Sequence, residues 1–187
     1  MGRWEPDARG RLASAALDLY LDPGYEQTTV ADIAARAGVT ERTFFRHFAD
    51  KREVLFAGSD LFRQTVVDAV AAAPEGASPL DAAAAGLDAA AVFLQSRPDE
   101  SFPRRRAAVI AANPSLQERE LLKMATVATS AAAALVARGA EPEEAAVAAE
   151  AAVAAFRLAF DRWTSGPDGG DLRALLAAGL ARFRALS

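Results

Sequence analysis

The stretch TTVADIAARAGVTERTFFRHFADKR, residues 28–52, decides the fold of this 187-residue chain. It opens with a helix start, because Thr29 and Asp32 stand three residues apart, the spacing of a capping box. The apolar residues that follow recur at helical spacing and form one face: Val30, Ile33, Ala34 and Ala37. Gly38 then supplies the left-handed backbone that ends a helix. We therefore predict a short helix that closes at this glycine.

A second short helix follows the turn. Thr40 can cap it, and Phe44 and Phe48, four residues apart, point to the same side. The remaining side chains face partly or wholly outward: Thr40, Glu41, Arg42, Thr43, Phe45, Arg46 and His47. Two helices around a turn that contains glycine, the second with a polar face, form a helix-turn-helix.

The same stretch resembles the N-terminal DNA-binding domain of TetR-family transcriptional regulators. The shared elements are Thr29, Ile33-Ala34, Ala37-Gly38-Val39, Thr40, the run Thr43–Phe48 and Lys51. The resemblance implies a TetR-like, all-α fold of about nine helices. It places a three-helix helix-turn-helix domain at residues 1–56 and a helical effector-binding and dimerisation domain at residues 57–187.

The composition agrees with an all-α chain and gives no support to an enzyme. Hydrophobic residues make up 52% of the chain, alanine dominates them, and no segment alternates with the period of a strand. There is no cysteine and His47 is the only histidine, so we expect no zinc site, other metal, cofactor or catalytic residue. The N-terminus lacks the apolar run of a signal peptide, and the longest uncharged segment, residues 124–137, is too short to span a bilayer. We expect a cytoplasmic protein without a membrane partner.

Charge is distributed unevenly along the chain. The net charge is −4, whereas residues 42–52 hold four basic residues against one acidic residue, a local net charge of +3. A basic spot on an acidic body suits a small phosphate footprint. A solvated surface is the alternative interpretation of the same cluster.

Arg42 is the strongest candidate for reading bases, because a guanidinium pairs with guanine O6 and N7 in a fork. Thr43 can touch a thymine methyl or a phosphate, and Glu41 can accept from cytosine N4 or screen Arg42. Phe45 stands where the family commonly has tyrosine; without a hydroxyl it cannot donate to phosphate, so we expect it to pack. The resemblance implies phosphate contacts at Thr29, His47 and Lys51. The full set of predicted DNA-binding residues is Thr29, Thr40, Glu41, Arg42, Thr43, Phe45, Arg46, His47 and Lys51.

The second domain is predicted to hold a small-molecule effector. Its candidate lining residues are mostly large and apolar: Phe62, Val66, Phe93, Phe102, Arg105, Ile110, Met124 and Phe160. Each apolar residue of this set also suits an ordinary core. Three consecutive arginines, Arg104–Arg106, either admit an acidic effector or pair with neighbours such as Asp99 and Glu100.

The last two predicted helices are expected to pair two copies of the chain. In the resembled family these helices form an intermolecular four-helix bundle, and a helix apolar around most of its circumference needs more cover than its own neighbours give. The predicted interface residues are Val147, Val153, Phe156, Leu172, Leu176, Leu180 and Phe183. An intramolecular core is the alternative. The segment from about Phe102 to Lys123 also loosely resembles C-terminal regions of mycofactocin-type regulators.

Together these features favour a homodimeric DNA-binding transcriptional regulator, a repressor released by an unidentified small-molecule effector. Its other partners would be a pseudo-palindromic double-stranded operator and a second copy of itself. The alternative is a helical ligand-binding or sequestering protein whose DNA-binding head is vestigial. The acidic net charge and the absent hydroxyl at Phe45 are the support for that alternative.

Overall fold

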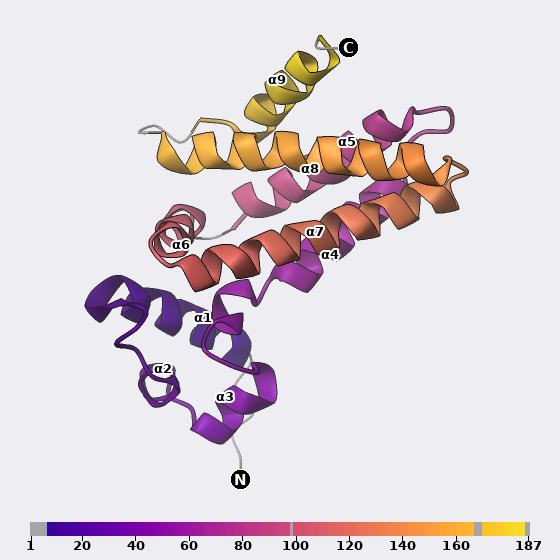
Figure 1. Ribbon diagram of the computed structural model, residues 1–187. Coiled ribbons are helices and arrows are strands. Elements are labelled where there is room, and N and C mark those ends of the chain that lie inside the picture. Colours follow the sequence, from indigo (N-terminus) through magenta and orange to yellow (C-terminus); the bar gives the residue numbers. More distant parts are fainter. Residues whose placement is uncertain (1–6, 98, 167–169, 186–187) are drawn as a thin grey trace. The chain divides into compact units, whose positions relative to one another are not determined.

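The computed structural model describes residues 7–97, 99–166 and 170–185. This part of the chain is all-α, with no strand, which confirms the predicted fold class (Figure 1). Its nine α-helices are α1 (Ala8–Leu19), α2 (Val30–Arg36), α3 (Glu41–His47), α4 (Ser59–Ala71), α5 (Pro79–Gln95), α6 (Phe102–Ala111), α7 (Pro114–Ala137), α8 (Pro142–Ser165) and α9 (Leu172–Arg184). A π-type turn, η1 (Tyr20–Gly24), follows α1, and a 3₁₀ turn, η2 (Glu53–Phe56), precedes α4.

The chain forms two compact units that do not follow the sequence order. The first unit runs to Ser59 and also includes residues 105–119; the second holds residues 60–104 and the chain from residue 120 onward. The end of the first segment lies close to the predicted boundary after residue 56. The prediction did not foresee that most of α6 and the first residues of α7 belong with the helix-turn-helix. Long-range contacts of arginine side chains account for this difference, as described below.

Within the first unit, α2 and α3 pack in sequence and α1 packs against α2 and η2. The end of α2 has the predicted form, with Gly38 at φ +70°. The amide of Val39 donates to the Ala34 carbonyl at 2.9 Å and that of Gly38 to the Ala35 carbonyl at 3.1 Å, the paired bonds of a Schellman motif. The local sequence therefore fixes the turn between α2 and α3.

The segment after α3 consists of a 3₁₀ turn and a separate α-helix. Asp50 caps the turn, because its Oδ1 accepts from the amides of Arg52 at 2.8 Å and Glu53 at 3.1 Å. The helical turn that follows is η2, which closes with a 3₁₀-type bond from the Ala57 amide to the Val54 carbonyl. The α-helix begins anew at Ser59, after Gly58. Glycine is among the poorest helix formers, so a break in the helix at this point costs little free energy.

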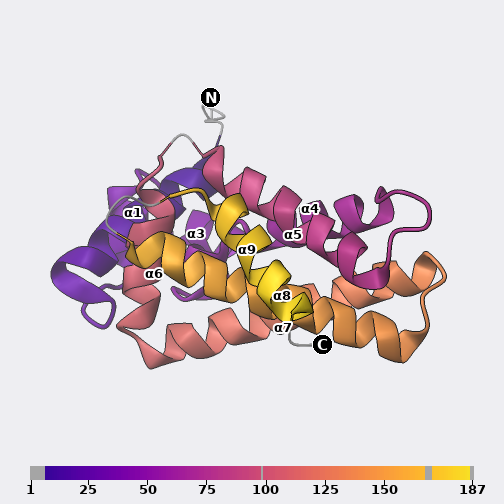
Figure 2. The ribbon, with the colours of Figure 1, turned by 90° about the horizontal axis from the view of Figure 1, so that it is seen from above.

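In the second unit α8 packs on α5 and on α9, and α9 lies across α8 in both views (Figures 1 and 2). The buried face of α8 is built largely from small residues, among them Ala145, Ala149 and Ala152. Larger core side chains come from the neighbouring helices: Phe62, Val66, Val70, Leu87, Leu135, Leu172 and Leu176. Small residues on one helix allow the backbones to approach, and the larger residues fill the remaining space.

Gly86 of α5 provides a test of this packing. A Cβ at this position would lie 2.7 Å from Val70 Cγ2 and 2.9 Å from the Val66 carbonyl oxygen. The carbonyl is a backbone atom of α4, so relieving this contact would require the helix to shift. We expect Gly86→Ala to lower the free energy of unfolding by about 1–2 kcal/mol. Gly179→Ala is the matched control, since its Cβ would meet only ordinary contacts at 3.7 and 3.8 Å. Urea unfolding at equal protein concentration should give a lower free energy of unfolding for Gly86→Ala than for Gly179→Ala. The reverse order would contradict the close contact of Gly86 with Val66 and Val70.

The length and composition of helix α7 are relevant to the prediction that the protein has no membrane partner. The helix is 24 residues long and, by length and composition alone, apolar enough to cross a bilayer, although its longest uncharged run is too short. A core helix in a globular protein passes the same test, and α7 contributes Val127, Ala131 and Leu135 to the core of the second unit. These residues bury one side of α7 in that unit, whereas only 28% of its most apolar 18-residue window is buried.

Candidate nucleic-acid interface

Thr29 forms the N-terminus of α2 in the predicted capping box. Its hydroxyl accepts from the Asp32 amide at 3.2 Å and donates to Asp32 Oδ2 at 2.6 Å, and its own amide donates to the same oxygen at 2.9 Å. The Thr29 hydroxyl and amide bonds hold the pKa of the Asp32 carboxyl below its usual value. Both donors of Thr29 are thus engaged by a carboxylate, so a phosphate contact requires the hydroxyl to turn away from Asp32.

Helix α3 begins at Thr40, whose Oγ1 accepts from the Thr43 amide at 3.2 Å. The two threonine hydroxyls lie 3.1 Å apart and share a hydrogen bond. Phe44 is completely buried and Phe48 nearly so, as their four-residue spacing predicts. The opposite side of the helix is exposed and consists of Glu41, Arg42, Phe45 and Arg46, with Thr43 and His47 half-buried at its margins.

Arg42 and Arg46 are the two cations of this exposed side, one turn of helix apart. Within the described part of the chain, neither has a hydrogen bond or an ion pair, and both are exposed. An arginine held by no intramolecular partner keeps all five N–H donors for a ligand. The capped α3 therefore presents two available guanidinium groups on one surface.

His47 differs from the sequence prediction of a phosphate contact. Its Nε2 atom is buried and has no hydrogen-bond partner among the described residues. The ring lies beside Phe48, with centroids 6.4 Å apart. A phosphate can reach this nitrogen only if the ring turns, so the predicted contact requires a turned ring or the other ring nitrogen.

Lys51, predicted to contact phosphate, has backbone carbonyls as its partners in the structure. Its ammonium donates to the carbonyls of Tyr25 at 2.8 Å, Thr28 at 3.1 Å and Glu26 at 3.4 Å, and lies 4.4 Å from the centroid of the Tyr25 ring. These contacts engage all three N–H bonds of the ammonium. Lys51 therefore clamps the turn before α2, because its ammonium supplies hydrogen bonds to three carbonyls of that turn. In this conformation the ammonium points to these carbonyls and not to a phosphate-binding surface.

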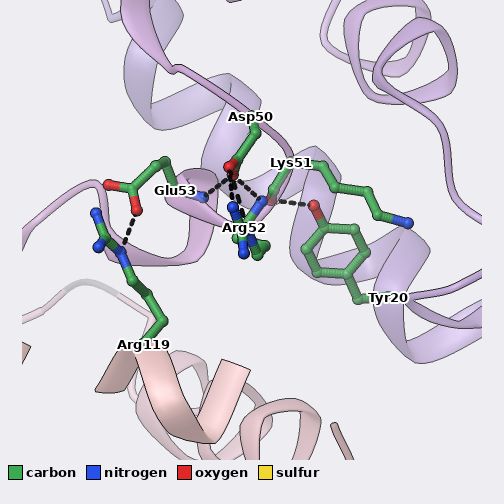
Figure 3. A network of polar contacts seen from close by, with 6 residues as sticks. All are labelled: Tyr20, Asp50, Lys51, Arg52, Glu53 and Arg119. Atoms are coloured by element: carbon green, nitrogen blue, oxygen red, sulfur yellow. Dashed lines mark hydrogen bonds and ion pairs between the residues drawn. The ribbon is translucent and has the colours of Figure 1, made fainter. Parts of the chain in front are cut away.

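The backbone of Lys51 joins the same clamp (Figure 3). Its carbonyl accepts a hydrogen bond from the Tyr20 hydroxyl at 2.5 Å. Burial, with smaller contributions from Tyr25 and Asp50, raises the pKa of Tyr20, so the phenol keeps the proton that it donates. Side chain and backbone of one residue thus connect the segment after α3 to the end of α1 and to the start of α2.

Asp50, the one acid already counted in the local net charge of +3, pairs with Arg52 (Figure 3). Its Oδ2 accepts from Arg52 Nη2 at 2.7 Å and Nε at 3.1 Å. Burial alone would raise the pKa of Asp50, but the hydrogen bonds from Arg52 and from the Glu53 amide outweigh it and the pKa is lowered. With Arg52 paired to Asp50, the net +3 of residues 42–52 is carried by Arg42, Arg46 and Lys51. The Lys51 ammonium is engaged by carbonyls, so within the described residues Arg42 and Arg46 are the two of these cations with unoccupied donors.

Three arginines from beyond residue 100 are part of the first unit. Arg105 pairs with Asp18 of α1, whose other oxygen lies 3.9 Å from Arg36 of α2. Arg106 Nε donates to the Leu55 carbonyl at 2.8 Å, with its guanidinium 4.9 Å from the Phe56 ring centroid. Arg119 of α7 pairs with Glu53 of η2 (Figure 3). Sequence reasoning missed these contacts, since nothing local in the sequence identifies partners 51 to 87 residues away.

The predicted effector-pocket residues divide between the two units. Arg105 and Ile110 belong to the first unit, where Arg105 is paired with Asp18. In the second unit Phe62 and Val66 are buried in the core, and Phe93, Met124 and Phe160 are half-buried against it. Phe102 is half-buried beneath the Arg97 guanidinium, 4.6 Å from its ring centroid. Val66, with no exposed surface, offers nothing for a ligand to contact in this conformation.

The predicted dimer-interface residues also divide. Five of the seven are buried in the core of the second unit: Val153, Phe156, Leu172, Leu176 and Leu180. These five pack within their own chain, so their assignment to an interface needs correction. Val147 and Phe183 are exposed by 62% and 41%. The sequence pattern located apolar faces on α8 and α9 but did not separate the inner face from the outer one.

Sequence comparisons identify both regions of the chain. Residues 12–57 match the family described as "Bacterial regulatory proteins, tetR family", and residues 77–186 match the family described as "MftR C-terminal domain". The HTH-type transcriptional regulator TcmR of Streptomyces glaucescens is 43% identical over 74 residues, which are 40% of this chain and 33% of TcmR. The transcriptional activator FasR of Mycolicibacterium smegmatis is 37% identical over 51 residues, 27% of this chain and 23% of FasR. The chain thus matches one third or less of the length of these two relatives.

Solved structures extend the likeness to the whole fold. SmeT, the repressor of the Stenotrophomonas maltophilia multidrug efflux pump SmeDEF, superposes with a TM-score of 0.59 at 19% identity, covering 93% of this chain and 89% of SmeT. The fatty acid degradation regulator FadR from Bacillus halodurans gives a TM-score of 0.56 at 17% identity, covering 95% of this chain and 94% of FadR. The two family matches show that the chain belongs to the tetR family of bacterial regulatory proteins and carries a C-terminal domain of the MftR type.

Proposed function

We propose that the protein is a homodimeric repressor that binds a pseudo-palindromic operator and leaves it when a small molecule binds the second unit. The observation that carries the DNA-binding part is the exposed side of α3, where Arg42 and Arg46 have no partner within the described residues. A recognition helix reads base edges from the major groove with the side chains of its N-terminal part. Arg42, in the first turn of α3, occupies such a position.

The dimer is supported by a second apolar stripe on α8. Val147, Ala151, Ala154 and Leu158 follow one another at spacings of four, three and four residues, so they share one side of the helix. Leu158 is 68% exposed and Val147 62%, although the opposite side of α8 is fully covered by the chain itself. On α9, Phe183 is also exposed. A second copy of the chain that covers this stripe would remove its apolar surface from water.

Leu158→Glu is expected to turn the dimer into a monomer at micromolar concentration, because each copy would place a carboxylate in the apolar stripe. Light scattering coupled to size-exclusion chromatography measures the mass directly. Leu61→Glu is the matched control: Leu61 of α4 is 59% exposed but lies outside the stripe, so this variant should stay dimeric. Two dimeric variants would show that this stripe is not the interface.

The second unit is the proposed effector-binding part. Its aromatic side chains form a continuous series, with ring centroids 5.6 Å apart for Phe62 and Phe156, 6.1 Å for Phe156 and Phe160, and 5.7 Å for Phe160 and Trp163. Such a wall suits a small apolar or amphipathic molecule. Triclosan, found in a SmeT complex of similar fold, is a ligand of that type in that protein. An effector releases DNA only if it binds the DNA-incompetent state more tightly than the DNA-bound state.

A genomic-fragment selection tests the proposal. Purified protein is incubated at low salt with fragments of its own genome, and the retained DNA is sequenced, with and without small-molecule extract of the same cells. We expect a two-fold symmetric site near the protein's own gene and loss of retention with extract. Failure to retain any site would favour the alternative of a ligand-binding protein with a vestigial head. We place this activity in the cytoplasm, where the chromosome is accessible.

A further inference from the structure

Phe45 is the one large apolar side chain on the exposed side of α3. The residue is 56% exposed, so much of its surface remains in contact with water. It lies one helical turn after Arg42 and directly before Arg46, the two cations of this side of α3, neither of which has a partner within the described residues. An exposed phenyl ring at an ordinary surface position needs no explanation. Here it occupies the centre of the surface that faces DNA in the proposed function, on which this inference rests.

The orientation of the ring is set from within the fold. Phe45 meets Phe44 edge to face, with centroids 5.4 Å apart and an interplanar angle of 81°. Phe44 is completely buried, so the contact holds the Phe45 ring against a fixed neighbour. A side chain with a preset orientation loses less conformational freedom when it is buried by a partner.

The chemistry of a phenyl ring narrows what it can contact. It has no donor or acceptor for a phosphate oxygen or for the polar base edges, and covering those groups with it would leave them without hydrogen bonds. The major groove presents one apolar group, the C5-methyl of thymine, and phenylalanine is among the side chains that contact it. We propose that Phe45 determines specificity by recognising a thymine methyl group in each half-site of the operator.

The test uses the operator duplex obtained from the genomic selection, with each thymine replaced in turn by deoxyuridine, which lacks only the methyl group. Fluorescence anisotropy at fixed salt gives the dissociation constant of each duplex. We expect one thymine per half-site to be sensitive, with affinity falling about fourfold for each methyl removed. Phe45→Ala should bind thymine and deoxyuridine equally at that position. Because the side chain is exposed, this variant should keep the helical circular dichroism of the parent.

Arg42→Ala is the control variant: it should bind all duplexes more weakly and keep the thymine preference at the sensitive position. Two results overturn the inference while leaving the proposed function intact. In one, the parent protein binds the operator but no thymine is sensitive. In the other, Phe45→Ala keeps the full preference, which would assign the methyl contact to another residue such as Thr43. If the parent protein retains no DNA at all, the proposed function fails and the inference fails with it.

Discussion

Replacing Arg42 by alanine should remove most of the preference of this protein for its operator over random DNA. Arg42 is exposed in the first turn of α3 and has no intramolecular partner within the described residues, so its guanidinium is available to a base edge. A bidentate arginine–guanine contact contributes roughly 1–3 kcal/mol of discrimination, which is about a 5- to 150-fold change in the affinity ratio. Competition binding between operator and random duplexes measures that ratio directly.

Two further variants separate charge from geometry at this position. Arg42→Lys keeps the charge but loses the planar fork, so it should retain nonspecific affinity and lose much of the discrimination. Arg182→Ala removes an exposed arginine from α9 and should change neither quantity. Equal discrimination by the parent and by Arg42→Ala would show that Arg42 does not read a base.

Replacing Lys51 by methionine should destabilise the first unit, by about 2–3 kcal/mol. The ammonium donates to the carbonyls of Tyr25, Thr28 and Glu26, and methionine fills a similar volume without any donor. Those carbonyls would be left with fewer hydrogen bonds next to the Thr29 cap of α2. Thermal unfolding followed by circular dichroism, together with hydrogen exchange of the α2 amides, measures the loss.

The salt dependence of DNA binding distinguishes the two possible roles of Lys51, a clamp on the turn before α2 and a contact to phosphate. If Lys51 acts as the clamp, Lys51→Met should weaken binding to every sequence while the slope of log K against log salt stays unchanged. A lost phosphate contact would instead reduce the slope by about one. Arg46→Met serves for comparison, because Arg46 is exposed and has no partner within the described residues. Tyr20→Phe, which removes the hydroxyl bonded to the Lys51 carbonyl, is a milder variant if the methionine protein unfolds.

The sequence by itself determined the helices and the turn between them. Thr29 and Thr40 each cap the helix that the pattern predicts, and Gly38 ends α2 with positive φ. These signals are readable because donor and acceptor lie three or four residues apart, within one turn of helix. The buried positions Phe44 and Phe48 followed from helical spacing for the same reason.

The outer and inner faces of α8 could not be distinguished from the sequence alone. Val147 and Val153 lie on the same alanine-rich helix and were given the same role, yet one is exposed and the other is buried. Hydrophobic periodicity identifies the sides of a helix that leave water, but it does not say which neighbour covers them. In α8 both sides are apolar, and the packing of α8 on α5 and α9 determines which side is buried within the chain.

Only the tertiary structure decided which charged side chains remain available for DNA. The sequence did not identify the partners of Lys51, Arg52, Arg105 and Arg106, which in the folded chain are carbonyls, Asp50 and Asp18. Several of these partners lie 23 to 87 residues away, and their choice depends on which backbone segments the core brings together. The helix-turn-helix is therefore determined by local sequence. Which side chains stay exposed and without a partner on α3, namely Arg42, Phe45 and Arg46, also depends on the long-range packing that engages the other basic side chains.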